Sequence, residues 1–148
     1  MNRVLFRAEE LPMPSWTKEA GSFIRRVLDV LGVKNREVSV LFCNNRYIKS
    51  LNAQYRNRDE PTDVLSFPLG EAVPGGKGPR PAGDIVVSLD ALEENARFFK
   101  VSENEELRRL LVHGILHLSG YDHATNKPGE PMLKTQEEIL ARLGESIL

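Results

Sequence analysis

Residues 113–123 read His-Gly-Ile-Leu-His-Leu-Ser-Gly-Tyr-Asp-His, and they contain all three histidines of the 148-residue chain. The apolar residues around the first two histidines predict a buried helix. His113 and His117 are four residues apart, so a helix places both imidazoles on one face. Gly120 is a residue type that ends helices and turns the chain back. His123 follows where the returning chain could supply a third imidazole.

This spacing is typical of a catalytic zinc site, in which three neutral imidazoles leave a fourth position open. The spacing of the three histidines is that of the long metalloprotease motif. In that motif a glutamate follows the first histidine and serves as general base, whereas Gly114 follows it here. We therefore expect one metal ion, most simply zinc, on His113, His117 and His123. Nickel, copper or iron would also suit imidazole ligands.

Two other interpretations of the histidines stay open at this point. They could be ordinary polar residues, although a buried imidazole needs a hydrogen-bond partner. They could also form a closed structural site, which requires four protein ligands. The single cysteine, Cys43, is distant in sequence, and Asp122 is the nearest residue that could complete such a shell.

The composition indicates one globular domain over residues 1–148. The hydrophobic fraction of 41% and the charged fraction of 28% are ordinary for soluble proteins. A single cysteine excludes an intramolecular disulfide, and we find neither a signal peptide nor a run long enough to span a membrane. We expect a cytoplasmic protein. The net charge of −1 gives no indication of nucleic-acid binding, so an RNA partner would need a local basic patch.

Hydrophobic periodicity and capping signals predict an α+β domain, with a small mixed sheet of about four strands and about five helices in two or three layers. Ser102-x-x-Glu105 is a capping box that starts the histidine helix. Asn44 or Asn45, and Ser88 or Asp90, are alternative caps of two other helices. We expect strands at 3–8, 37–43, 64–69 and 82–89, and helices at 14–31, 45–55, 90–100, 102–118 and from 131 to about 143.

The segment 70–81 lies between two of these strands and holds four glycines and three prolines. It is either a surface loop or a flap beside the site.

Three stretches together resemble the YbeY family of bacterial endoribonucleases. They are residues 113–123, the block Leu51-Asn-Ala-Gln-Tyr-Arg56 with Pro61-Thr-Asp-Val-Leu-Ser-Phe-Pro68, and Gly83-Asp-Ile-Val-Val-Ser88. The likeness covers roughly residues 35 to 143.

The resemblance implies a metal-dependent endoribonuclease that is specific for single strands. Its substrate would be ribosomal RNA, in maturation of the 3′ end of the small-subunit RNA and in ribosome quality control, with the ribosome or ribosomal proteins as partners. It implies zinc on His113, His117 and His123. It also implies that Arg56 corresponds to the arginine that the family needs for activity. The residues expected to act in catalysis are therefore Arg56 and His113.

The chemistry of RNA cleavage is compatible with a glycine at position 114. RNA carries its own nucleophile, the 2′-hydroxyl, so a dedicated carboxylate base matters less than in a peptidase. Whether water or the 2′-hydroxyl attacks is left open. Glycine within a helix costs about 1 kcal/mol relative to alanine. Gly114 serves either to let substrate approach or to let the helix pack tightly.

Other residues near these motifs have either a functional or a purely structural interpretation. Arg56 can clasp phosphate oxygens through two N–H groups, whereas its neighbours Arg46, Lys49 and Arg58 are typical of a solvated helix face. Aspartates could orient an imidazole or could cap local turns: these are Asp63, Asp84 and Asp122. The aromatic residues at helical spacing fit core positions: these are Trp16, Tyr47 and Tyr55.

Two rival functions remain. One is a zinc-dependent peptidase or other hydrolase, which the ligand frame supports and Gly114 opposes. The other is a metal-stabilised ribosome assembly module without catalytic activity, which the modest net charge favours slightly.

Overall fold

The computed structural model describes residues 1–69, 79–121, 129–144 and 147 of the chain. Within these residues, four strands and five helices follow one another in the order expected from the sequence. They are β1 (Arg3–Ala8), α1 (Thr17–Val30), β2 (Arg36–Cys43), α2 (Asn45–Arg56), β3 (Val64–Pro68), β4 (Arg80–Ser88), α3 (Leu89–Phe99), α4 (Glu103–Leu118) and α5 (Pro131–Arg142).

The strands form one mixed sheet with the order β1-β2-β4-β3. β1 pairs with β2 and β2 pairs with β4 in parallel, whereas β3 runs antiparallel to β4. Val40 lies opposite Ile85 at the centre of the sheet, and β1 and β3 form its two edges. The expected α+β class and mixed sheet are confirmed.

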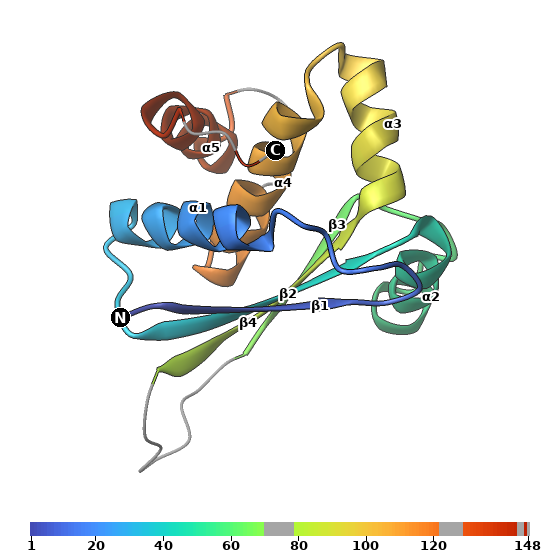
Figure 1. The fold of residues 1–148 in the computed structure, drawn as a ribbon, viewed down its shortest axis with the longest axis horizontal. Coiled ribbons are helices and arrows are strands. Elements are labelled where there is room, and N and C mark those ends of the chain that lie inside the picture. Colours follow the sequence, from blue (N-terminus) through green and yellow to red (C-terminus); the bar gives the residue numbers. More distant parts are fainter. Residues whose placement is uncertain (70–78, 122–128, 145–146, 148) are drawn as a thin grey trace.

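Helices cover both faces of the sheet, which gives three layers (Figure 1). Side chains alternate between faces along a strand, and β2 shows this clearly: Val40 and Phe42 pack with α1 and α4, while Leu41 and Cys43 pack with Ile48 of α2. The larger core lies between the sheet and the α1–α4 layer. Its largest fully buried side chains include Phe23, Ile24, Phe42, Ile85, Leu107, Leu111, Ile115, Leu116 and Met132.

Side-chain caps set the start of three helices, and they decide between the alternatives left by the sequence. Asn44 rather than Asn45 caps α2, and Ser88 rather than Asp90 caps α3. The Asp90 carboxylate instead accepts a hydrogen bond from the Asn45 backbone N–H at 2.9 Å, and thereby ties α3 to α2. Ser102 caps α4 as expected. Each such cap stabilises its helix by about 1 kcal/mol.

The C-terminus of α4 is a Schellman motif centred on Gly120. Gly120 has a φ of +95°, which strongly favours glycine. Its N–H donates to the carbonyl of His117 at 3.1 Å, and the N–H of Tyr121 donates to the carbonyl of Leu116 at 2.9 Å. The expectation that Gly120 ends the histidine helix is confirmed.

Three expectations need correction or lie beyond the described residues. α1 begins at Thr17 rather than at Pro14. Tyr55 is 56% exposed and stacks edge-on against Phe67 at 5.5 Å; the buried residues of α2 are Ile48 and Asn52. Residues 70–78 of the Gly- and Pro-rich segment lie outside the described residues, and Arg80 and Pro81 already belong to β4. No helix of the described residues is long and apolar enough to cross a membrane.

Candidate active site

Close packing of α4 on the sheet fixes the position of the histidine helix. A Cβ atom on Gly114 would lie 2.9 Å from Cγ2 of Ile85, which is fully buried in β4. The hydroxyl of Ser66 on β3 donates to the carbonyl of Gly114 at 3.3 Å. Of the two explanations for this glycine, the structure favours tight helix packing, because its missing side chain would point into the core.

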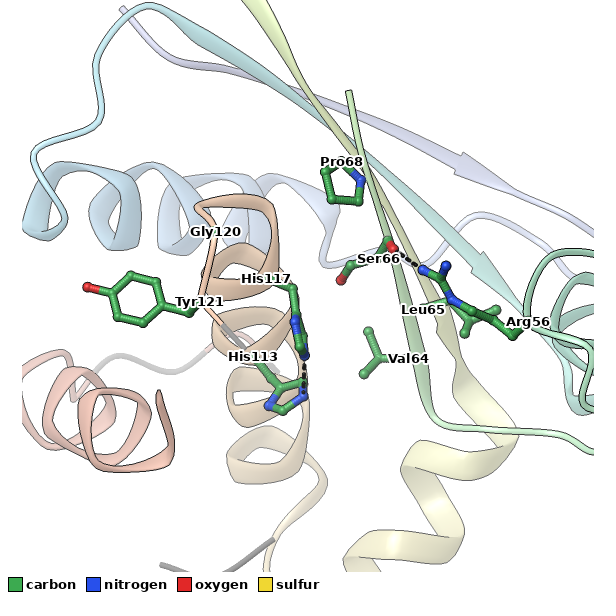
Figure 2. Close-up of a pocket in the computed structure, with 9 residues that line it drawn as sticks. All are labelled: Arg56, Val64, Leu65, Ser66, Pro68, His113, His117, Gly120 and Tyr121. Carbon is green, nitrogen blue, oxygen red and sulfur yellow. Dashed lines mark hydrogen bonds between the residues drawn. The ribbon is translucent and has the colours of Figure 1, made fainter. Parts of the chain in front are cut away.

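The two imidazoles of α4 converge through their Nε2 atoms. These atoms of His113 and His117 lie 3.2 Å apart, and the ring planes meet at 75° (Figure 2). A tetrahedral zinc ion with Zn–N bonds of about 2.0–2.1 Å would hold two such nitrogens about 3.3–3.4 Å apart. The separation therefore suits a shared metal ion without rearrangement of α4.

The other ligand expected from the sequence, His123, and the neighbouring Asp122 lie outside the described residues. Among the residues that are described, no group of three histidine, cysteine, aspartate or glutamate side chains could hold a metal ion. The complete ligand set therefore stays a prediction.

Arg56 and both helical histidines border one hollow of about 470 Å³. The hollow lies between α4 and the edge strand β3, and its remaining walls are mostly apolar (Figure 2). No carboxylate from the described part of the chain lines it. The lining residues are Arg56, Val64, Leu65, Ser66, Pro68, His113, His117, Gly120 and Tyr121.

Arg56 is held at the rim of this hollow by contacts with β3. Its Nη2 donates to the carbonyl of Ser66 at 2.7 Å, and its guanidinium lies over the ring of Phe67, 5.1 Å from the centroid. Arg56 is exposed at the last turn of α2. The structure thus brings an arginine that is 57 positions before His113 in the sequence to the same hollow.

The other cations near Arg56 are engaged differently. Each forms an ion pair with an acidic side chain on the surface: Arg46 with Glu10 at 2.7 Å, Lys49 with Asp59 at 4.0 Å, and Arg58 with Glu60 at 3.6 Å. None of the three lines the hollow. The interpretation as a solvated helix face therefore holds for Arg46 and Lys49, whereas Arg58 is exposed but lies beyond the end of α2.

The aspartates do not reach the imidazoles within the described residues. Asp63 accepts hydrogen bonds from the N–H of Val64 at 2.8 Å and from Asn95 at 3.0 Å. Asp84 is exposed and alternates along β4 with Ile85, which faces α4. Asp84 therefore points to the opposite face of the sheet.

One buried residue beside the histidines was missed by the sequence reasoning. The Oε1 atom of Gln136 lies 2.7 Å from Nδ1 of His113, and Gln136 is only 6% exposed. The available signal was a polar residue within the apolar stripe of α5, between Met132 and Ile139.

Glu106 and Glu137 line one cavity together with Gln136, and their pKa values are shifted in opposite directions. Burial raises the pKa of Glu106, whose side chain accepts a hydrogen bond from Asn95. Arg109 donates two hydrogen bonds to Glu137, at 3.0 and 3.1 Å, and holds the pKa of that carboxyl below its ordinary value. Glu137 is therefore ionised at neutral pH.

Comparison with known proteins shows that the chain is similar to endoribonucleases. A family model described as Endoribonuclease YbeY matches residues 6–144. Proteins named endoribonuclease YbeY are 54% identical in Treponema denticola, over 80% of this chain and 78% of that protein, and 42% identical in Treponema pallidum, over 96% and 90%. The solution structure of TM1509 from Thermotoga maritima matches with a TM-score of 0.64 and 32% identity, over 93% of this chain and 86% of that one.

Proposed function

Because the chain belongs to the endoribonuclease YbeY family, we propose that it is a metal-dependent endoribonuclease that cleaves single-stranded RNA. The observation that carries this proposal is the convergence of two imidazole nitrogens, 3.2 Å apart, in a hollow that Arg56 also borders. That arrangement combines a site suited to a cation with a donor suited to a phosphate.

In this proposal His113, His117 and His123 hold one zinc ion, although other transition metals suit imidazole as well. Zinc bound there would polarise the scissile phosphate as a Lewis acid and lower the pKa of water. The lone pairs on both Nε2 atoms must face the ion, so each ring must carry its proton, if any, on Nδ1. The hydrogen bond from Nδ1 of His113 to Gln136 is compatible with that requirement.

Arg56 would bind the substrate phosphate in the same hollow. Its guanidinium carries five N–H donors, of which the bond to Ser66 uses one. The remaining N–H groups can donate to two phosphate oxygens at once and stabilise the negative charge that develops during cleavage. Contact with Phe67 and Ser66 restricts the side chain, so little rotational freedom is lost when phosphate binds.

Peptide hydrolysis fits this hollow less well. A peptidase with this ligand spacing places a glutamate at the position of Gly114, and here a side chain at that position would meet Ile85. The described lining also offers no carboxylate as an alternative base. RNA needs such a base less, because its 2′-hydroxyl is already part of the substrate.

The physiological substrate that we propose is ribosomal RNA, with roles in maturation of the small-subunit 3′ end and in ribosome quality control. The support for it is the resemblance of the three sequence blocks to the family. Association with the ribosome or its proteins, and a cytoplasmic location, belong to the same proposal.

A matched pair of arginine variants tests the proposed function. Arg56→Ala removes the donor beside the imidazoles, and we expect kcat on a labelled single-stranded RNA to fall about 10²–10³-fold, as for loss of an oxyanion donor. Arg58→Ala removes an exposed arginine that pairs with Glu60, and it should cleave like the parent protein. Equal activity of both variants would contradict the role of Arg56.

A substrate with a single 2′-deoxy nucleotide at the cut site identifies the nucleophile. Undiminished cleavage excludes attack by the 2′-hydroxyl and leaves water. Loss of cleavage at that one position indicates the 2′-hydroxyl.

A further inference from the structure

The side chain of Gln136 connects α5 to the histidine pair on α4. Gln136 lies on the buried face of α5, and α5 packs directly against α4 (Figure 1). Its carbonyl oxygen is 2.7 Å from Nδ1 of His113. A carbonyl oxygen only accepts hydrogen bonds, so this contact requires a proton on Nδ1.

The orientation of the Gln136 amide is set by the next residue along the helix. Its Nε2 donates to Oε2 of Glu137 at 3.2 Å. A carboxylate only accepts hydrogen bonds, so a flipped amide would bring the Gln136 oxygen against a carboxylate oxygen. Glu137 is itself held by two hydrogen bonds from Arg109. Glu137 therefore accepts hydrogen bonds from both Arg109 and Gln136, and the Gln136 oxygen is left to accept from Nδ1 of His113.

A proton on Nδ1 of His113 determines the state of its Nε2 atom, which faces the imidazole of His117. A neutral histidine carries one ring proton, and Gln136 places it on Nδ1 of His113. The Nε2 atom of His113 then presents its lone pair toward Nε2 of His117, 3.2 Å away. A partner on the far ring nitrogen also fixes the rotation of the imidazole about its Cβ–Cγ bond.

We propose that Gln136 is a positioning residue that selects the metal-binding tautomer of His113 and orients its ring. This inference rests on the proposed metal site, and it assigns the selecting group to α5 rather than to the histidine motif. Gln136 does not line the hollow that Arg56 and the imidazoles border, so it acts through His113 and not on the RNA.

Zinc affinity of purified protein, measured by competition with a chromogenic chelator, tests the proposal without RNA. Gln136→Leu has similar bulk and no acceptor, and we expect its zinc dissociation constant to rise about 10–100-fold, as for other lost outer-shell partners. Gln136→Glu, always made together with Glu137→Gln so that two carboxylates do not face each other, restores an acceptor opposite Nδ1, and it should bind zinc within a few-fold of the parent protein. Glu138→Gln, an exposed change on the same helix, should leave affinity unaltered.

The absorption spectrum of bound Co²⁺ gives a second measurement. If Gln136 only stabilised the fold, its replacement would leave this spectrum unchanged. The visible absorption of bound Co²⁺ reports the geometry of its ligands, and it should change in Gln136→Leu and return in Gln136→Glu. Circular dichroism and thermal unfolding with chelator present show whether each variant folds. If Gln136→Leu does not fold, Gln136→Met, which also lacks a strong acceptor, is judged by the same criteria.

Two results would overturn the positioning role: parental zinc affinity and cobalt spectrum in Gln136→Leu, or an equal loss of affinity in Gln136→Glu. Failure of the proposed function is a different result. Parent protein that binds zinc but leaves RNA intact contradicts the nuclease and not the role of Gln136. Parent protein that binds no zinc contradicts both.

Discussion

Replacement of Gly114 by alanine tests how α4 is held on the sheet. The added Cβ would lie 2.9 Å from Cγ2 of Ile85 and 3.1 Å from its Cδ1. Ile85 is fully buried and β-branched, so it cannot rotate away cheaply. Overpacking of this kind costs about 1–3 kcal/mol, while removal of a helical glycine stabilises by about 1 kcal/mol. We expect Gly114→Ala to lower the free energy of unfolding by about 1 kcal/mol, between about 0 and 2.

A double-mutant cycle isolates the contact. Ile85→Ala removes all three atoms that the new Cβ would meet, and alone it should cost about 2–5 kcal/mol. In that background Gly114→Ala meets no obstacle and should stabilise by about 1 kcal/mol. The predicted coupling in urea unfolding, with chelator in every sample, is therefore about 1–3 kcal/mol.

Two results would refute this reasoning about Gly114. A coupling smaller than about 0.5 kcal/mol would show that the two sites are independent. A Gly114→Ala protein that is as stable as its parent but no longer cleaves RNA would instead support the substrate-clearance explanation.

Three further predictions concern ionisable groups. Glu137→Gln removes a carboxyl whose pKa is lowered by Arg109. Above the ordinary glutamate pKa of about 4.3, the free energy of unfolding should be larger for the parent than for Glu137→Gln. This difference should vanish as pH falls through the lower pKa of the folded state. Urea unfolding from pH 3 to 7, with chelator, measures this, and a difference that grows toward acid would contradict the sign. Burial raises the pKa of Cys43 to about 12, so iodoacetamide at pH 8 should label it only after unfolding, as read by mass spectrometry; rapid labelling of folded protein would contradict its burial. Arg56→Lys keeps the charge but not the paired donors, so its kcat should fall between those of the parent and Arg56→Ala, and parental kcat would show that charge alone suffices.

Local signals in the sequence predicted most of the fold. Caps and helix ends depend on a few adjacent residues, so the sequence alone identifies the roles of Ser102 and Gly120 correctly. Strand positions followed from apolar alternation. The mixed character of the sheet was expected, but the position of β3 as an antiparallel edge strand depends on long-range pairing that no local pattern encodes.

The site was less predictable, because its parts come from distant elements. The helical spacing of His113 and His117 correctly implied that their rings meet. The contact between Gln136 and His113 joins residues 23 positions apart, and it depends on how α5 packs on α4. Charge pattern alone did not distinguish Arg56 from its basic neighbours. The family resemblance did, and the structure adds the contacts of Arg56 with β3.

The most direct test of the account is cleavage of a labelled single-stranded RNA by purified protein, with and without chelator, beside a folded His117→Ala control. We predict that chelator and the substitution each abolish cleavage, and that added zinc restores it to the parent protein alone. Cleavage that survives both treatments, or its absence from parent protein with metal fully bound, would contradict a metal-dependent nuclease built on these histidines.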